Sequence, residues 1–93
     1  MKVSDTKLQI IEFGEEPEDI YYCLIDSRVS PDGLDIEKMR LSDPRNIDDE
    51  FRKQGCLMMF TGDEIEELVR RGDLDRSELR DSLYELAKRE GVI

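Results

Sequence analysis

Residues 56–67 read CLMMFTGDEIEE, in which an apolar run is followed at once by the start of a helical pattern. The run Cys56–Phe60 is short and wholly apolar, which is typical of a buried strand. Thr61 and Glu64 follow at the spacing of a capping box, in which each side chain accepts a hydrogen bond from the other residue's backbone N–H. The sequence therefore predicts a buried strand that passes directly into a helix.

Two helices are predicted after this junction. Gly72 and Gly91 are placed to end them, because glycine adopts the left-handed conformation at a helix C-terminus without strain. Residues Asp75–Glu78 read as a second capping box at the start of the last helix. The apolar stripe of the first helix consists of Ile65, Leu68 and Val69, and that of the last helix of Leu79, Leu83, Leu86 and Ala87. Both stripes have helical spacing, so each helix should pack one face on a core.

The N-terminal part of the chain has the composition of strands. Lys7–Phe13 and Ile20–Arg28 are rich in β-branched and aromatic residues, and GEEPED between them supplies glycine and proline for a turn. This pattern predicts a β-hairpin. Tyr21–Ile25 is apolar on both faces, which favours a central strand that helices cover on one side.

The middle of the chain is less regular. Leu34–Leu41 alternates at its start and is predicted as a weak strand, while Asp43 and Pro44 read as the beginning of a short helix that Gly55 ends. Strands first and helices later predict one α+β domain over residues 1–93. We expect a small, mainly antiparallel sheet with two C-terminal helices and one short helix on one face.

The net charge of the chain limits the classes of partner that it can bind. The formal net charge is −10, which repels the phosphates of nucleic acids and anionic lipid surfaces, so we expect cations, basic proteins or neutral surfaces as partners. No apolar run is long enough to span a membrane, and the N-terminus lacks the apolar region of a signal peptide. The sequence thus predicts a cytoplasmic protein, and its high charge and three amide side chains are typical of a thermophile.

The sequence lacks the residues that several kinds of catalytic and binding site require. The chain has no histidine, which removes the common nucleophile–base pairs, and it has no glycine-rich phosphate-binding motif. We therefore expect no enzymatic activity and no organic cofactor. Cys23 and Cys56 alone cannot supply the four ligands of a zinc site. They are expected to be reduced and buried, and sequence leaves open whether they pair.

The stretch SPDGLDIEKMRLSDPRNIDDE, residues 30–50, contains seven carboxylates and is the candidate metal site. No glycine in the chain has acids at the positions that an EF-hand loop requires. Asp32 and Asp35 instead flank a glycine turn, and Asp48, Asp49 and Glu50 form the densest acidic triplet. If the short helix packs beside that turn, the five carboxylates would converge on one calcium ion. Alternatively, the triplet only stabilises the first turn of the helix through its dipole.

A resemblance favours the metal hypothesis. In its acidity, its lack of histidine and the segments Asp32–Asp35 and Asp48–Glu50, the chain resembles small acidic archaeal α+β proteins of unknown role. Some of these bind calcium without an EF-hand. The resemblance is one of composition rather than of an aligned motif, and it implies weak divalent-cation binding.

The alternative function is a protein–protein interaction module with an acidic surface and no metal site. Such a surface would steer a basic partner by its electrostatic field. The carboxylates expected in it are Glu15, Glu16, Glu18, Asp19, Glu64, Glu66 and Glu67. The adjacent pairs Tyr21–Tyr22 and Met58–Met59 should each divide between the core and the opposite face of a strand.

Overall fold

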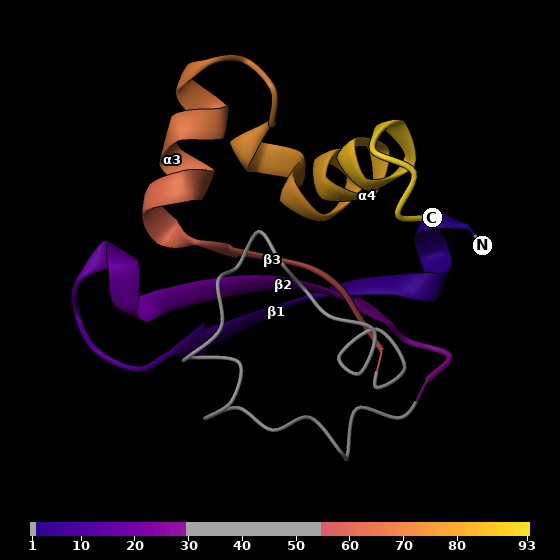
Figure 1. Ribbon diagram of the computed structural model, residues 1–93, viewed down its shortest axis with the longest axis horizontal. Helices are drawn as coiled ribbons and strands as arrows, with labels where there is room; N and C mark the ends of the chain where they lie inside the picture. The colour runs from indigo at the N-terminus through magenta and orange to yellow at the C-terminus, as the bar shows by residue number, and fades with distance from the viewer. Residues whose placement is uncertain (1, 30–54) are drawn as a thin grey trace.

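The computed structural model describes residues 2–29 and 55–93, and Figure 1 shows their arrangement. The strands are β1 (Thr6–Glu12), β2 (Ile20–Asp26) and β3 (Cys56–Thr61), and the α-helices are α3 (Gly62–Arg70) and α4 (Leu79–Arg89). The described residues also form the short 3₁₀ helices η1 (Val3–Asp5), η2 (Pro17–Asp19) and η4 (Arg76–Glu78). The strand predicted at 34–41 and the short helix predicted from Asp43 lie outside the described residues.

The three strands form one antiparallel sheet in the order β1-β2-β3. The predicted hairpin is present, with Gln9 opposite Cys23, and β2 is the central strand of the three. In Figure 1, α3 and α4 lie together above the sheet. The predicted α+β class, with two C-terminal helices on one face of a small antiparallel sheet, is confirmed.

Each face of the sheet has its own buried cluster, because successive side chains of a strand point to opposite sides. The cluster beneath the helices contains Leu24, Met58, Ile65, Leu74, Leu83, Leu86 and Ala87. The cluster on the opposite face contains Tyr21, Cys23, Ile25, Cys56 and Met59. Tyr22 packs against the first cluster while Tyr21 belongs to the second, so the tyrosine pair divides between faces as predicted, and the methionine pair does the same.

The junction between β3 and α3 has the predicted capping box. The backbone N–H of Glu64 donates to Thr61 Oγ1 at 3.3 Å, and the N–H of Thr61 donates to Glu64 Oε1 at 3.5 Å. Gly72, at φ +81°, ends α3 in a Schellman motif, in which Asp73 N–H donates to the carbonyl of Leu68 at 2.9 Å. Local signals in the sequence are enough to set both ends of this helix.

The second predicted capping box does not form between Asp75 and Glu78, although Asp75 does cap the turn. The carboxylate of Asp75 accepts hydrogen bonds from the Ser77 hydroxyl at 2.7 Å and from Ser77 N–H at 3.0 Å, and these bonds lower the pKa of Asp75. In the predicted box the Glu78 side chain would accept a hydrogen bond from Asp75 N–H. Asp75 N–H instead donates to Ser82 Oγ at 3.0 Å. The chain therefore enters the last helix through the 3₁₀ turn η4, and α4 begins at Leu79.

Candidate functional site

The five predicted metal ligands are not placed by the structure. Asp32, Asp35, Asp48, Asp49 and Glu50 all lie outside the described residues. Within residues 2–29 and 55–93, no three His, Cys, Asp or Glu side chains are grouped so that they could hold a metal ion. The calcium site therefore stays a prediction from sequence.

The structure brings two acidic segments together that are far apart in the sequence. The turn η2, between β1 and β2, packs against the first residue of α3. A Cβ atom on Gly62 would lie only 2.7 Å from the backbone carbonyl oxygen of Pro17, so only glycine permits this approach. We call the resulting patch the acidic surface. It consists of Glu15, Glu16, Glu18, Asp19, Asp63 and Glu64.

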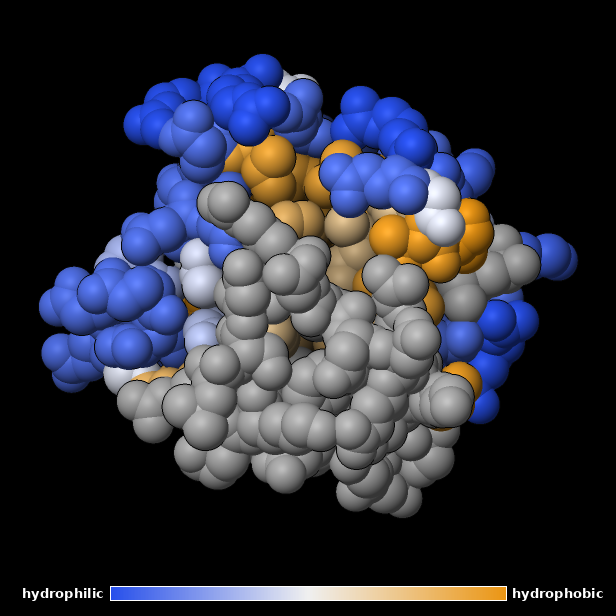
Figure 2. All heavy atoms as spheres, viewed as in Figure 1, coloured by the Kyte–Doolittle hydropathy of each residue, from blue (hydrophilic) through white to orange (hydrophobic). Residues whose placement is uncertain are grey.

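No basic residue neutralises this patch from its own segments. The chain carries none between Lys7 and Arg28, or between Gln54 and Arg70. Glu64 is engaged in the cap of α3. Among the described residues, no ion pair involves the other five carboxylates of the acidic surface. Figure 2 shows the hairpin turn as a hydrophilic lobe at the left of the molecule.

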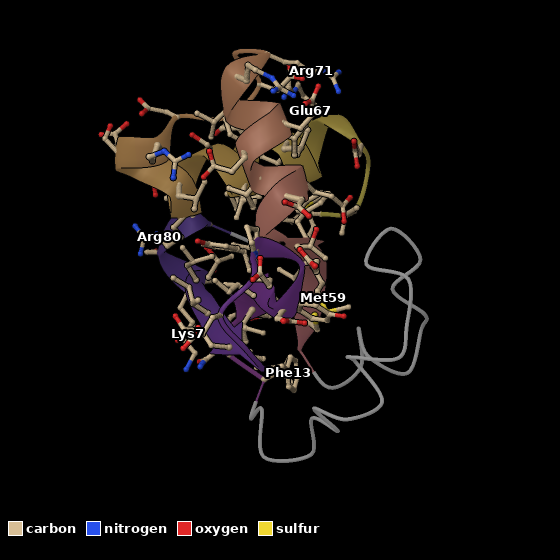
Figure 3. All side chains as sticks on the ribbon, turned by 90° about the vertical axis from the view of Figure 1, so that its left-hand side faces the viewer. Lys7, Phe13, Met59, Glu67, Arg71 and Arg80 are labelled. Atoms are coloured by element: carbon tan, nitrogen blue, oxygen red, sulfur yellow. The ribbon has the colours of Figure 1, made fainter. Side chains whose placement is uncertain are left out.

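Two carboxylates that the sequence assigned to this patch are instead neutralised. Glu66 forms an ion pair with Arg76, which lowers the pKa of Glu66, and Glu67 forms one with Arg70 within the same helix. Figure 3 places Glu67 toward the far end of α3, beside Arg71. Sequence reasoning missed the Glu66–Arg76 pair because it joins two elements, and it omitted Asp63, which lies in the first turn of α3.

A buried carboxylate at the end of β2 has a structural role. Asp26 accepts hydrogen bonds from Arg28, at 3.1 Å from Nε to Oδ1 and 3.1 Å from the terminal nitrogen to Oδ2. The backbone N–H of Arg28 adds a third bond to Oδ1 at 3.0 Å. The guanidinium holds the pKa of Asp26 below its ordinary value of 3.8. With its charge satisfied, Asp26 is poorly suited to proton transfer near neutrality.

The two thiols are free, buried and in contact. Cys23 lies on β2 and Cys56 on β3, and neither has exposed surface. The Cys23 S–H donates to the sulfur of Cys56, which raises the pKa of Cys23 and lowers that of Cys56. The expectation of reduced, buried cysteines agrees with this arrangement, and the fold also brings them together, which sequence left open.

An open depression of about 420 Å³ lies between β1 and the start of α4. Its lining consists of Leu8, Ser77, Glu78, Leu79, Arg80 and Asp81. The hydroxyl of Ser77 donates to Asp75 Oδ1 at 2.7 Å as part of the helix cap, and Arg80 pairs with Asp81 at 3.1 Å. These polar groups are committed to local structure, so the depression offers no activated nucleophile.

No protein-family model matches this chain, and neither does any curated protein or solved structure. Its function is therefore inferred from its own residues. Within the described part of the chain, no helix has the length and apolar character needed to cross a membrane.

Proposed function

We propose that this protein is a non-enzymatic interaction module whose acidic surface binds a basic segment of a partner protein. The observation that supports this is the close approach of Pro17 to Gly62, which sets the hairpin turn beside the first turn of α3. Carboxylates from both segments then act together on one approaching partner.

The two segments contribute differently. Asp63 and Glu64 lie at the N-terminus of α3, where the helix dipole stabilises negative charge, so part of their charge serves the helix. Glu15, Glu16 and Glu18 are exposed on the hairpin turn and have no such compensation among the described residues. The hairpin turn is therefore the part of the acidic surface that a lysine- or arginine-rich segment meets first.

The expected binding is fast, weak and sensitive to salt. A single exposed ion pair contributes about 0.2–1 kcal/mol, so several pairs are needed for measurable affinity. A net charge of −10 raises the rate at which a basic partner is captured, and salt screens this attraction over about 8 Å at physiological ionic strength.

The test uses a lysine- and arginine-rich peptide as the probe. The variant Glu15→Gln, Glu16→Gln, Glu18→Gln is compared with Asp81→Asn, Glu85→Gln, Glu90→Gln, which removes three exposed carboxylates from the α4 region. Both variants change the net charge equally. We expect the first to weaken binding several-fold and to remove the peptide-induced amide shifts at residues 14–19 and 62–64. Equal weakening by both variants would mean that only net charge matters, and the proposal would then be wrong.

Weak calcium binding by Asp32, Asp35, Asp48, Asp49 and Glu50 is the second candidate function. The observation that favours it is the density of carboxylates in residues 30–50. The two candidates use different residues, so separate variants test them.

A further inference from the structure

Three sulfur atoms gather on the face of the sheet opposite α3 and α4. They belong to Cys23 on β2 and to Cys56 and Met59 on β3, and all three residues are fully buried in one cluster. Met59 is the direct cross-strand partner of Cys23. Figure 3 shows Met59 and Phe13 in the part of the molecule away from the two helices.

A β-bulge directs Cys56 to this face. Strand alternation alone would put Cys56 on the same side as Met58, two residues later. The pairing instead passes from Leu24–Met58 to Ile25–Cys56, which skips Leu57 and reverses the alternation. Cys56 consequently joins the cluster of Cys23, while Met58 stays beneath the helices.

The register makes the two cysteines neighbours across the sheet. Cys23 is opposite Met59 and Cys56 is opposite Ile25. Both thiols are free and belong to one buried cluster, so their sulfur atoms are placed to bind a single ion through bonds of about 2.3 Å.

We propose that Cys23, Cys56 and Met59 form a buried site for a soft monovalent cation of the copper(I) class. Zinc is a poor fit because a structural zinc site takes four ligands from Cys, His, Asp and Glu, and no three of these side chains are grouped among the described residues. Calcium and magnesium take oxygen ligands. Thiolate and thioether sulfur are the donors that favour copper(I).

Binding exchanges one proton for one ion. The cation replaces the proton of one of the two thiols, forming a sulfur–metal bond, and the proton leaves to solvent. One thiolate and one monovalent cation are together neutral, which avoids net charge in the core. The other thiol and the thioether of Met59 belong to the same cluster and supply neutral donors.

The test is a titration of the full reduced chain without oxygen, in which copper(I) is buffered by a chromophoric chelator. Because the thiols have no exposed surface, the ion is supplied while the protein refolds from denaturant. We expect one ion per chain, thiolate-to-copper absorption in the near ultraviolet and loss of both with Cys56→Ala. A wild-type chain that folds but takes no copper(I) from the chelator would overturn the proposal.

Met58 and Met59 supply a matched pair of variants. They are neighbours on β3, both are buried, and their side chains lie in different clusters. Methionine to leucine nearly conserves volume, so both variants should fold. We expect Met59→Leu to weaken copper(I) binding by about tenfold or more and Met58→Leu to leave it unchanged. If the two variants bind copper(I) with equal affinity, Met59 is not a ligand of the ion.

Because Cys56→Ala opens a small gap in the core, circular dichroism must show that this variant folds before its copper titration is interpreted.

Discussion

The first residue of α3, Gly62, lies against the backbone carbonyl of Pro17, with room for a hydrogen atom but not for a side chain. This contact fixes η2 to the start of α3. Because Thr61 caps α3 and also ends β3, the hairpin turn, the third strand and the helix are joined at one point. Backbone contacts therefore hold both segments of the acidic surface, the hairpin turn and the first turn of α3, in fixed positions relative to each other.

Gly62→Ala should destabilise the fold by about 1–3 kcal/mol, the usual effect of forcing extra atoms into a packed contact. The new methyl group would meet backbone rather than the end of a flexible side chain, so η2 or α3 has to shift. Urea unfolding measures the change. The control is Asp63→Ala, an exposed neighbour in which the loss of the helix-dipole interaction is offset by the higher helix propensity of alanine, so we expect a change within about 0.5 kcal/mol. Similar effects of the two substitutions would contradict the importance of this contact.

Thr61→Ala should destabilise α3 by about 1 kcal/mol, because the N–H of Glu64 loses its capping acceptor. Thr61→Ser keeps the hydroxyl and should recover most of the loss. Thermal unfolding of the three proteins gives the comparison. If the serine variant is as unstable as the alanine variant, the cap is not the source of the effect, and the loss of the threonine methyl group is.

Local sequence signals predicted much of this fold. The capping box at Thr61–Glu64, the glycine at position 72 and the hairpin between β1 and β2 each depend on residues close together in the chain. These three features could be predicted because they depend on backbone hydrogen bonds and on strand patterns that short segments of sequence specify.

Contacts between distant elements could not be predicted in this way. The bulge at Leu57 reverses the side of Cys56, and a sequence pattern of period two places that residue with Met58 instead. The pairing of Glu66 with Arg76 depends on how α3 and η4 come together. For the contact between Pro17 and Gly62, the sequence did contain a signal. Glycine is a poor helix former, so its presence at the first position of α3 indicates that another backbone segment lies close.

The Asp26–Arg28 interaction predicts a specific pH dependence of stability. Arg28 lowers the pKa of Asp26, so the folded state favours the ionised carboxylate more than the unfolded state does. Its stabilisation is fully present above the unfolded pKa near 3.8 and is lost as pH falls through the lower folded pKa. Arg28→Met should therefore destabilise the protein at pH 7 and make less difference at pH 2–3.

Urea unfolding of both proteins across this pH range measures the effect. Arg80→Met is the control, since Arg80 pairs with the exposed Asp81 and should change stability little at any pH. A difference between wild type and Arg28→Met that stays constant down to pH 2 would show that the arginine acts through packing rather than through the charge of Asp26.

The calcium hypothesis predicts a response confined to residues 30–50. We expect a dissociation constant no better than the ~10⁻⁴ to 10⁻³ M of loose calcium sites, so backbone amide shifts should saturate over millimolar calcium. Asp48→Asn with Asp49→Asn should abolish that response and leave the amide spectrum of the α3 and α4 regions unchanged. Magnesium is the control ion, because it keeps its water ligands more firmly and should produce weaker shifts.

Small shifts spread over every acidic segment, including Glu15–Glu18, would instead indicate non-specific screening of a chain with net charge −10. That result would leave the acidic surface as the functional candidate, since its binding of a basic peptide depends on none of the five predicted calcium ligands.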